Sequence, residues 1–295
     1  MTVLVANSLG EVLDALAADP TATLLAGGTD LMVEVNEGHR RFPGGDDALV
    51  IALAGVPELS SWTVDEASRS LTLGAGVRWN EIEHEPLRAM VPALAEAART
   101  VGSPQIRHAG TIGGNLATCS PAGDGLPVLV ALDAIVHLAS ASGRRSLPVG
   151  EFMVGVKRTA LEPGELIESI EMPLLDGWQG YSKVGVRNAM VIATASACVA
   201  TDAANRSIRI ALGSVAPTVI RCPDAEAAAI AAVDWGTGVI SATDAARAGE
   251  LAAAASRPID DHRSTAAYRR HAVGVMVRRL LQRAFAGAAA EEESA

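Results

Sequence analysis

The segment from Gly110 to Asp124, GTIGGNLATCSPAGD, gathers residue types that can bind a phosphorylated ligand. It contains four glycines, Gly113 and Gly114 among them, together with hydroxyl, amide and carboxylate side chains: Thr111, Asn115, Thr118, Ser120 and Asp124. Glycine lets the backbone adopt a positive φ and approach a bulky ligand closely, because no Cβ intervenes. Successive exposed N–H groups in such a turn form a concave anion site, which suits a pyrophosphate.

A second, shorter glycine pair lies upstream in Ala26-Gly27-Gly28-Thr29-Asp30, directly after the apolar Leu24-Leu25. Either pair alone is typical of an ordinary turn. Two such segments, well separated along the chain, favour one extended ligand that is held at two points.

Five short motifs carry a family resemblance. AGGTD at 26–30, SPQIR at 103–107, TIGGN at 111–115 and SPAGD at 120–124 are followed by ELIESIEMP at 165–173. Lys183 and VAPTVIRC at 215–222 then come in the expected order. As an ordered set, these motifs resemble the FAD-binding medium subunit of the molybdenum hydroxylases, the family of xanthine dehydrogenase and aerobic CO dehydrogenase. The resemblance covers nearly the whole chain, to about residue 286.

The resemblance implies that the chain binds FAD noncovalently and supplies no catalytic or metal-binding residue of its own. The first phosphate segment would be residues 26–30, Ala26 to Asp30, and the second would be Thr111, Gly113, Gly114 and Asn115, with Thr118 and Ser120 as hydroxyl donors. Asp124 matches a carboxylate that binds a hydroxyl-bearing part of the cofactor. The same residue is also a suitable N-cap for a following helix.

Three further residues are assigned to the flavin ring by the same resemblance. Val101 and Ile167 would pack against it, although a core valine at 101 is an equally sound interpretation. Lys183 would place a positive charge near the ring and stabilise its anionic reduced form. A surface lysine on a strand is the alternative. The run after Lys183, VGVRNAMV, lacks the acidic character of members that reduce NAD, so the electron acceptor stays open.

Several elements must position these residues. Ser8 and Glu11 predict a capped helix, and Thr23–Ala26 a short strand that delivers the glycine pair to a helix from Leu31. Asn80 is expected to cap a helix and Pro92–Val101 to form another, after which Val101–His108 leads into the principal binding loop, Gly110–Asp124. Beyond a strand at 165–172, strands at 179–184, 192–201 and 207–213 make a small sheet, and helices follow at 224–232, 242–255 and 264–286.

The fold implied is α+β. A vanillyl-alcohol-oxidase-type (PCMH) FAD-binding domain would occupy residues 1–175, in two α/β lobes of about 1–53 and 54–175. A small antiparallel sheet with helices, of the CO dehydrogenase flavoprotein C-terminal type, would occupy 178–286. We expect residues 287–295 to be a disordered acidic tail. There is no GxGxxG or GxxxxGK[ST], so a Rossmann or P-loop site has no support.

The implied partners carry the other cofactors of the assembly. A large subunit would hold molybdopterin and a small subunit two [2Fe–2S] clusters, from which electrons reach FAD and leave to NAD or another soluble acceptor. VAPTVIRC and KVGVRNAM are nearest to the purine-oxidising (xanthine) members. Two alternatives remain: a free-standing flavin reductase of the UDP-acetylmuramate type, and a flavin-free scaffold subunit.

Composition and short motifs exclude several further classes of protein. With 24 basic and 34 acidic residues, net charge −10, a nucleic-acid surface is not expected. The three cysteines, Cys119, Cys198 and Cys222, form no CxxC, which indicates a reduced cytoplasmic protein without its own iron–sulfur cluster. Among the six histidines there is no HExxH, and there is no GxSxG. Neither a signal peptide nor a membrane span is expected.

Overall fold

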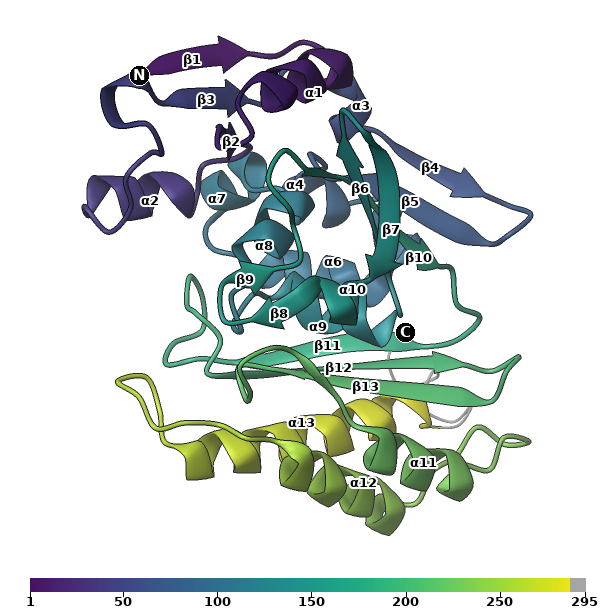
Figure 1. Ribbon diagram of the computed structural model, residues 1–295. Coiled ribbons are helices and arrows are strands. Elements are labelled where there is room, and N and C mark those ends of the chain that lie inside the picture. The colour runs from purple at the N-terminus through teal and green to yellow at the C-terminus, as the bar shows by residue number, and fades with distance from the viewer. Residues whose placement is uncertain (287–295) are drawn as a thin grey trace.

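The computed structural model describes residues 1–286. The tail at 287–295, for which disorder was predicted, lies outside the described residues. The three larger sheets follow one another from the N-terminus to the C-terminal helices (Figure 1), and hydrophobic clusters pack within and between them. The predicted α+β class is confirmed.

The N-terminal sheet is parallel, with strand order β1-β3-β2. Its elements are β1 (Thr2–Val5), α1 (Leu9–Ala18), β2 (Thr23–Leu25), α2 (Leu31–Asn36), a 3₁₀ turn (Gly45–Asp47) and β3 (Leu49–Ala52). The Ser8 hydroxyl accepts from the Glu11 N–H at 3.2 Å and caps α1, as predicted. Because β2 runs parallel to β3 and stops at Leu25, the glycine pair emerges at the carboxyl end of the strand.

The central sheet is antiparallel, with order β4-β5-β10-β6-β7. Its strands are β4 (Trp62–Asp65), β5 (Ser70–Gly74), β6 (Ile135–Ser140), β7 (Gly143–Pro148) and β10 (Leu166–Pro173), with a small hairpin of β8 (Met153–Gly155) and β9 (Arg158–Thr159). Its helices are α3 (Pro57–Ser60), α4 (Trp79–Ile82), α5 (Leu87–Met90), α6 (Pro92–Thr100), α7 (Pro104–Ala109), α8 (Ile112–Thr118), α9 (Gly125–Ala131) and α10 (Val149–Phe152).

Two expectations for this region are wrong. Helix α4 begins at Trp79 with Arg78 at the N-cap position, so Asn80 lies inside the helix and does not cap it. The binding loop predicted at Gly110–Asp124 contains α8, and the segment that leads into it contains α7. Each is started by a hydroxyl that accepts a backbone N–H: Ser103 accepts from Ile106, and Thr111 from Gly114. These caps offset the low helix propensity of the glycines.

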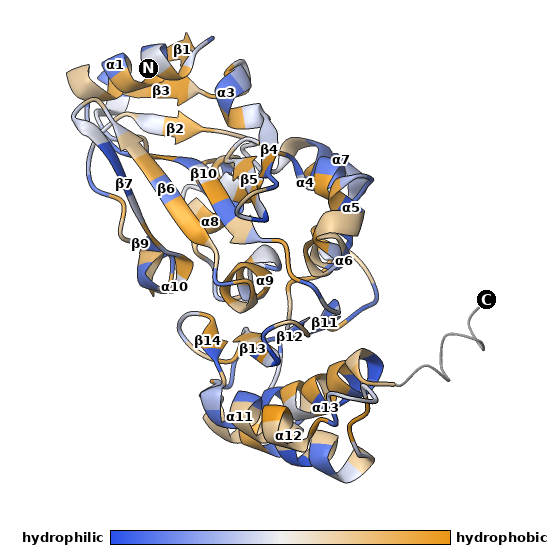
Figure 2. Cartoon of the chain, turned by 90° about the vertical axis from the view of Figure 1, so that its right-hand side faces the viewer, coloured by the Kyte–Doolittle hydropathy of each residue, from blue (hydrophilic) through white to orange (hydrophobic). Residues whose placement is uncertain are grey.

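The C-terminal sheet is antiparallel, with order β11-β12-β13-β14, and is covered by three helices. Its elements are β11 (Gln179–Val184), β12 (Ala195–Asp202), β13 (Ser207–Gly213), β14 (Ile220–Arg221), α11 (Pro223–Ala232), α12 (Ala242–Ala255) and α13 (Ala266–Ala284). Strand β12 begins at Ala195, not at the predicted Ile192, which is exposed. Every residue of β12 is buried, because α13 packs on the sheet from one side and α9 from the other (Figures 1 and 2). No helix among residues 1–286 has the length and hydropathy to cross a membrane.

The contact between α12 and α13 depends on glycine. A Cβ built on Gly249 would lie 2.4 Å from the Gly274 carbonyl oxygen of α13. We expect Gly249→Ala to lower the free energy of unfolding by about 1–3 kcal/mol, because the helices must move apart. Gly10→Ala in α1 is the matched control: its Cβ would have no neighbour nearer than 3.8 Å, so higher helix propensity should raise stability by up to about 1 kcal/mol. Urea denaturation followed by circular dichroism measures both. Equal effects would contradict the packing argument.

Candidate functional site

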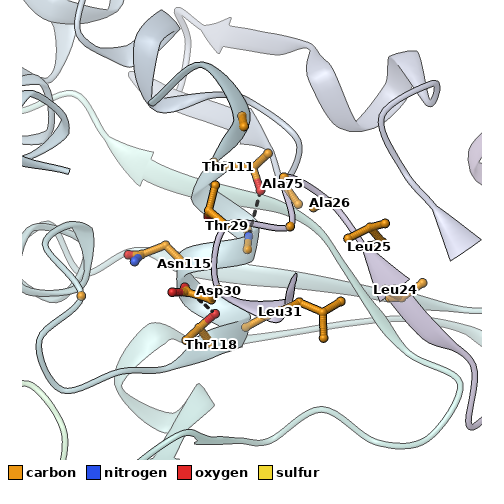
Figure 3. Close-up of a pocket in the computed structure, with 18 of the residues that line it drawn as sticks. Leu24, Leu25, Ala26, Thr29, Asp30, Leu31, Ala75, Thr111, Asn115 and Thr118 are labelled. Atoms are coloured by element: carbon orange, nitrogen blue, oxygen red, sulfur yellow. Dashed lines mark hydrogen bonds between the residues drawn. The ribbon is translucent and has the colours of Figure 1, made fainter. Parts of the chain in front are cut away.

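A cavity of about 1010 Å³ opens where the N-terminal sheet meets α7, α8 and the start of α9 (Figure 3). The cavity is at the upper end of the usual size range of ligand pockets, which suits an extended ligand. It brings together all but one of the residues that the sequence singled out: Ala26, Gly27, Gly28, Thr29, Asp30, Val101, Thr111, Gly113, Gly114, Asn115, Thr118, Ser120, Asp124 and Ile167. Lys183 is the exception, and it lies behind Asp124.

The turn from Gly27 to Asp30 forms one wall. A Cβ on Gly27 would lie 2.0 Å from the Ala109 carbonyl oxygen, so only glycine lets this turn approach α7 so closely. Gly28 has φ +69°, in the left-handed region that glycine adopts without strain. The backbone N–H groups of residues 27–30 donate to no acceptor among the described residues. Unpaired donors on a cavity wall suit an anionic ligand.

The opposite wall, Thr111 to Asn115, works differently from the predicted row of exposed N–H groups. The Ile112 and Gly113 N–H groups donate to the carbonyls of Val77 and Ala75, at 3.0 and 2.9 Å, and that of Gly114 donates to Thr111 Oγ1 at 3.0 Å. These donors are therefore already used. Glycine is needed at 113 because a Cβ there would meet the Ala75 Cβ at 2.5 Å. What this wall offers to a ligand is side chains and the bare surface of Gly114.

Polar side chains connect the two walls. The Thr118 hydroxyl donates to Asp30 Oδ2 at 3.2 Å, across the cavity floor (Figure 3). Asn115 Oδ1 is buried and has no hydrogen-bond partner in the described part of the chain. A buried acceptor without a partner is costly, so this oxygen is ready to accept from a ligand. Ser120 Oγ accepts from the Ala122 N–H at 3.3 Å and keeps its own proton free to donate.

Asp124 does not cap α9, although it stands at the N-cap position. Its Oδ1 accepts from the Tyr181 hydroxyl at 2.9 Å, and its Oδ2 accepts from Lys183 Nζ at 2.7 Å. The side chain of Asp124 is only 8% exposed and that of Lys183 only 7%. The alternative of a surface position for Lys183 is therefore wrong. Lys183 also donates to the Thr100 carbonyl at 3.1 Å. Tyr181 was not predicted as a site residue; the signal that could have revealed it is its place two residues before Lys183, on the same face of a strand.

Burial sets the electrostatics of this group. Burial raises the pKa of Asp124, while Lys183 and the Tyr181 hydroxyl oppose that rise. Burial and the neighbouring Asp124 charge raise the pKa of Tyr181 well above its ordinary value, so Tyr181 stays a phenol and a donor. Arg107, the last residue of the SPQIR motif, pairs with Glu83 at 2.8 Å.

Known proteins are similar to this chain in sequence and in fold. Residues 1–175 match the family described as FAD binding domain in molybdopterin dehydrogenase, and residues 181–284 match the CO dehydrogenase flavoprotein C-terminal domain. The carbon monoxide dehydrogenase medium chain of Hydrogenophaga pseudoflava is 32% identical over 289 residues, 95% of each chain. A structure of carbon monoxide dehydrogenase from the same organism superposes with a TM-score of 0.84 and 30% identity, covering 97% of each chain. The putative xanthine dehydrogenase FAD-binding subunit XdhB of Escherichia coli is 29% identical over 228 residues, 75% of this chain and 76% of that one.

The fold and the cavity thus define a flavoprotein component of an oxidoreductase, with FAD as its cofactor. More specifically, the chain belongs to the family of FAD-binding medium subunits of the molybdenum hydroxylases. The resemblance drawn from the motifs is confirmed. The solved carbon monoxide dehydrogenase is described as lacking the Mo-pyranopterin moiety of its molybdenum cofactor.

Removing the Lys183 ammonium tests the buried pair. Lys183→Met leaves the Asp124 carboxylate without its cation and raises the pKa of Asp124 further. A carboxyl whose pKa is raised by folding favours the folded state only while protonated, so the variant loses stability as pH rises. At about pH 8 we expect it to be about 3–5 kcal/mol less stable than the parent, and the deficit should narrow towards about pH 5. Denaturant titrations at several pH values measure this.

The matched control is Lys157→Met. Lys157 pairs with Glu34 but is 56% exposed, so water replaces the partner. Little change in stability is expected at any pH. A deficit for Lys183→Met that is equally large across the pH range would contradict the charge argument.

Proposed function

We propose that the cavity holds FAD noncovalently and that the chain passes electrons between iron–sulfur clusters of one partner and a soluble acceptor. The observation that carries the proposal is the pairing of two features in one cavity. Unpaired backbone donors of Gly27 to Asp30 suit a pyrophosphate, and polar side chains around Asn115 and Asp124 suit hydroxyl groups. FAD supplies the redox chemistry when it is bound, and the chain orients it and shields it from water.

The residue roles follow from where each side chain lies. Residues 26–30 bind the phosphates, and Gly114 leaves room beside them. Thr111, Asn115, Thr118, Ser120 and Asp124 make hydrogen bonds to polar parts of the cofactor. Gly113 acts indirectly by letting α8 pack closely. Val101 and Ile167 give apolar contact. Lys183 is 2.7 Å from Asp124, so its positive charge reaches the cavity largely offset by that carboxylate.

The division into domains is also a proposal. Residues 1–175 form the PCMH-type unit, with lobes of about 1–53 and 54–175, and residues 178–286 form the C-terminal unit. The ranges of the two family matches support this division. The hydrophobic cluster against α11 to α13 lies within the C-terminal unit, whereas the cluster of Trp79 and Phe152 also takes in Tyr181 and Cys198 of that unit.

The partners we propose are a molybdopterin-binding large subunit and a small subunit with [2Fe–2S] clusters. A relative from Paenarthrobacter nicotinovorans is named a subunit of a dehydrogenase complex, and it is 30% identical over 98% of this chain. The relatives are named as subunits of dehydrogenases for different compounds: xanthine, nicotinate and carbon monoxide. We favour xanthine or another purine as the substrate of the assembly, and NAD or another soluble molecule as acceptor. Three buried free cysteines support a cytoplasmic location.

Flavin content tests the site. In Gly114→Val the new side chain enters the cavity, because a Cβ at 114 meets nothing nearer than Thr111 Oγ1 at 3.0 Å. We expect this variant to lose bound FAD. Gly150→Val is the matched control, since a Cβ at 150 has no neighbour within 4 Å and lies away from the cavity. Absorption spectra before and after acid precipitation measure the flavin, which should move to the supernatant. A colourless parent chain that refuses added FAD would favour the scaffold.

Composition of the purified assembly tests the partners. The chain, tagged and isolated from its own cells, should bring down two further chains together with molybdenum and iron. Metal analysis and mass spectrometry of the same sample measure this. A yellow chain that purifies alone, without metal, would instead favour the free-standing reductase.

A further inference from the structure

Trp79 lies between Gly110 and Gly125, which flank the segment that lines one wall of the cavity. It is the first residue of α4, is 2% exposed, and lies in the cavity wall. Its backbone N–H donates to the Gly110 carbonyl at 3.2 Å. No sequence motif marks Trp79, because its neighbours Gly110 and Gly125 are distant along the chain.

The orientation of the indole follows from its contacts. Its Cδ1 lies 3.3 Å from the point that a Cβ on Gly110 would occupy, and its Cη2 and Cζ2 lie 2.4 and 3.3 Å from the corresponding point on Gly125. These atoms belong to the one edge of the ring that carries Nε1. The N–H edge therefore faces the space that the two glycines leave open.

This space holds a donor and an unmatched acceptor. Trp79 lines the cavity, and its Nε1 is not among the buried polar atoms without a partner in residues 1–286, so this N–H is open to the cavity and can donate to a ligand. Asn115 Oδ1, which lacks a partner among the same residues, lies 3.3 Å from the same point on Gly125. A hydroxyl group can accept from one and donate to the other.

We propose that Trp79 is a ligand-binding residue, whose Nε1–H donates to a hydroxyl of the bound flavin nucleotide while that hydroxyl donates to Asn115 Oδ1. The inference rests on the proposed function, since it needs FAD in the cavity. It adds a residue that none of the glycine motifs contains. It also explains why positions 110 and 125 carry no side chain, because a Cβ at either would crowd the indole edge.

Trp79→Phe tests this by removing the N–H while keeping an aromatic ring. The full chain is stripped of flavin, and FAD is titrated back with flavin fluorescence as the signal. We expect the Kd for FAD to rise about five- to fifteenfold, the usual effect of one lost hydrogen bond. Trp62→Phe is the matched control, because Trp62 packs in the same hydrophobic cluster but does not line the cavity. Its Kd should stay within about twofold of the parent.

An isosteric analogue separates the hydrogen bond from packing. Growth on benzothienylalanine, in which sulfur replaces the indole N–H, removes the donor from every tryptophan without changing ring size. In the Trp62→Phe chain, the analogue should raise the Kd for FAD by the same factor as the Trp79→Phe substitution does. In the Trp79→Phe chain, the analogue should cause no further rise in Kd. If the analogue binds FAD as the parent does, or if Trp79→Phe keeps the parent Kd, the gap holds only water and the proposal is overturned.

Two fragments locate the hydroxyl. Riboflavin carries the ribityl hydroxyls without phosphate, and ADP carries the ribose hydroxyls without flavin. The fragment that contains the bound hydroxyl should lose affinity with Trp79→Phe, and the other should not. Failure of the parent chain to bind FAD at all would refute the proposed function itself, and that outcome is visible before any variant is compared.

Discussion

The structure depends on a carboxylate that is almost removed from water. Asp124 can stay ionised at the back of the cavity only if donors satisfy both of its oxygens, because an isolated buried charge is very costly. Tyr181 and Lys183 supply those donors from alternate positions of β11. A third link, from the Tyr181 N–H to Glu96 at 2.7 Å, fixes the same strand against α6. The C-terminal unit is therefore seated by the chemistry of the cavity wall as well as by apolar packing.

Glycine makes the cavity possible, but not chiefly through unusual backbone angles. Among the motif glycines only Gly28 has a positive φ. Gly27 and Gly113 instead allow main chain to touch main chain or Cβ, against Ala109 and Ala75. The two walls can then lie close enough for Thr118 and Asp30 to meet. Motif glycines that serve close approach in this way tolerate no side chain, even though their backbone angles would.

Much of this could be predicted from sequence, for a physical reason. Thr23 to Leu31 encodes strand, turn and helix locally. The ordered motifs identified the family, and all of the residues assigned from them to the cofactor, except Lys183, line the cavity. Contacts between distant residues were not predictable. Helix α8 was hidden because two glycines at its start argue against a helix, and only the Thr111 cap reveals it. Arg269, on an apparently amphipathic helix, is 5% exposed and donates to the carbonyls of Thr194 and Ser214, which no periodicity indicates.

The Asp124–Lys183 pair changes how charge acts on the cavity. A lone ammonium near a redox ring would favour the reduced anion at every pH at which it is protonated. Paired at 2.7 Å with a carboxylate, it acts instead as a dipole, whose field falls off faster with distance. Burial raises the pKa of Asp124, so protonation of this one group begins at a higher pH than for an exposed carboxyl and exposes the full Lys183 charge. The charge that the cavity presents to its cofactor is therefore linked to the proton on Asp124, and through Tyr181 to the seating of β11.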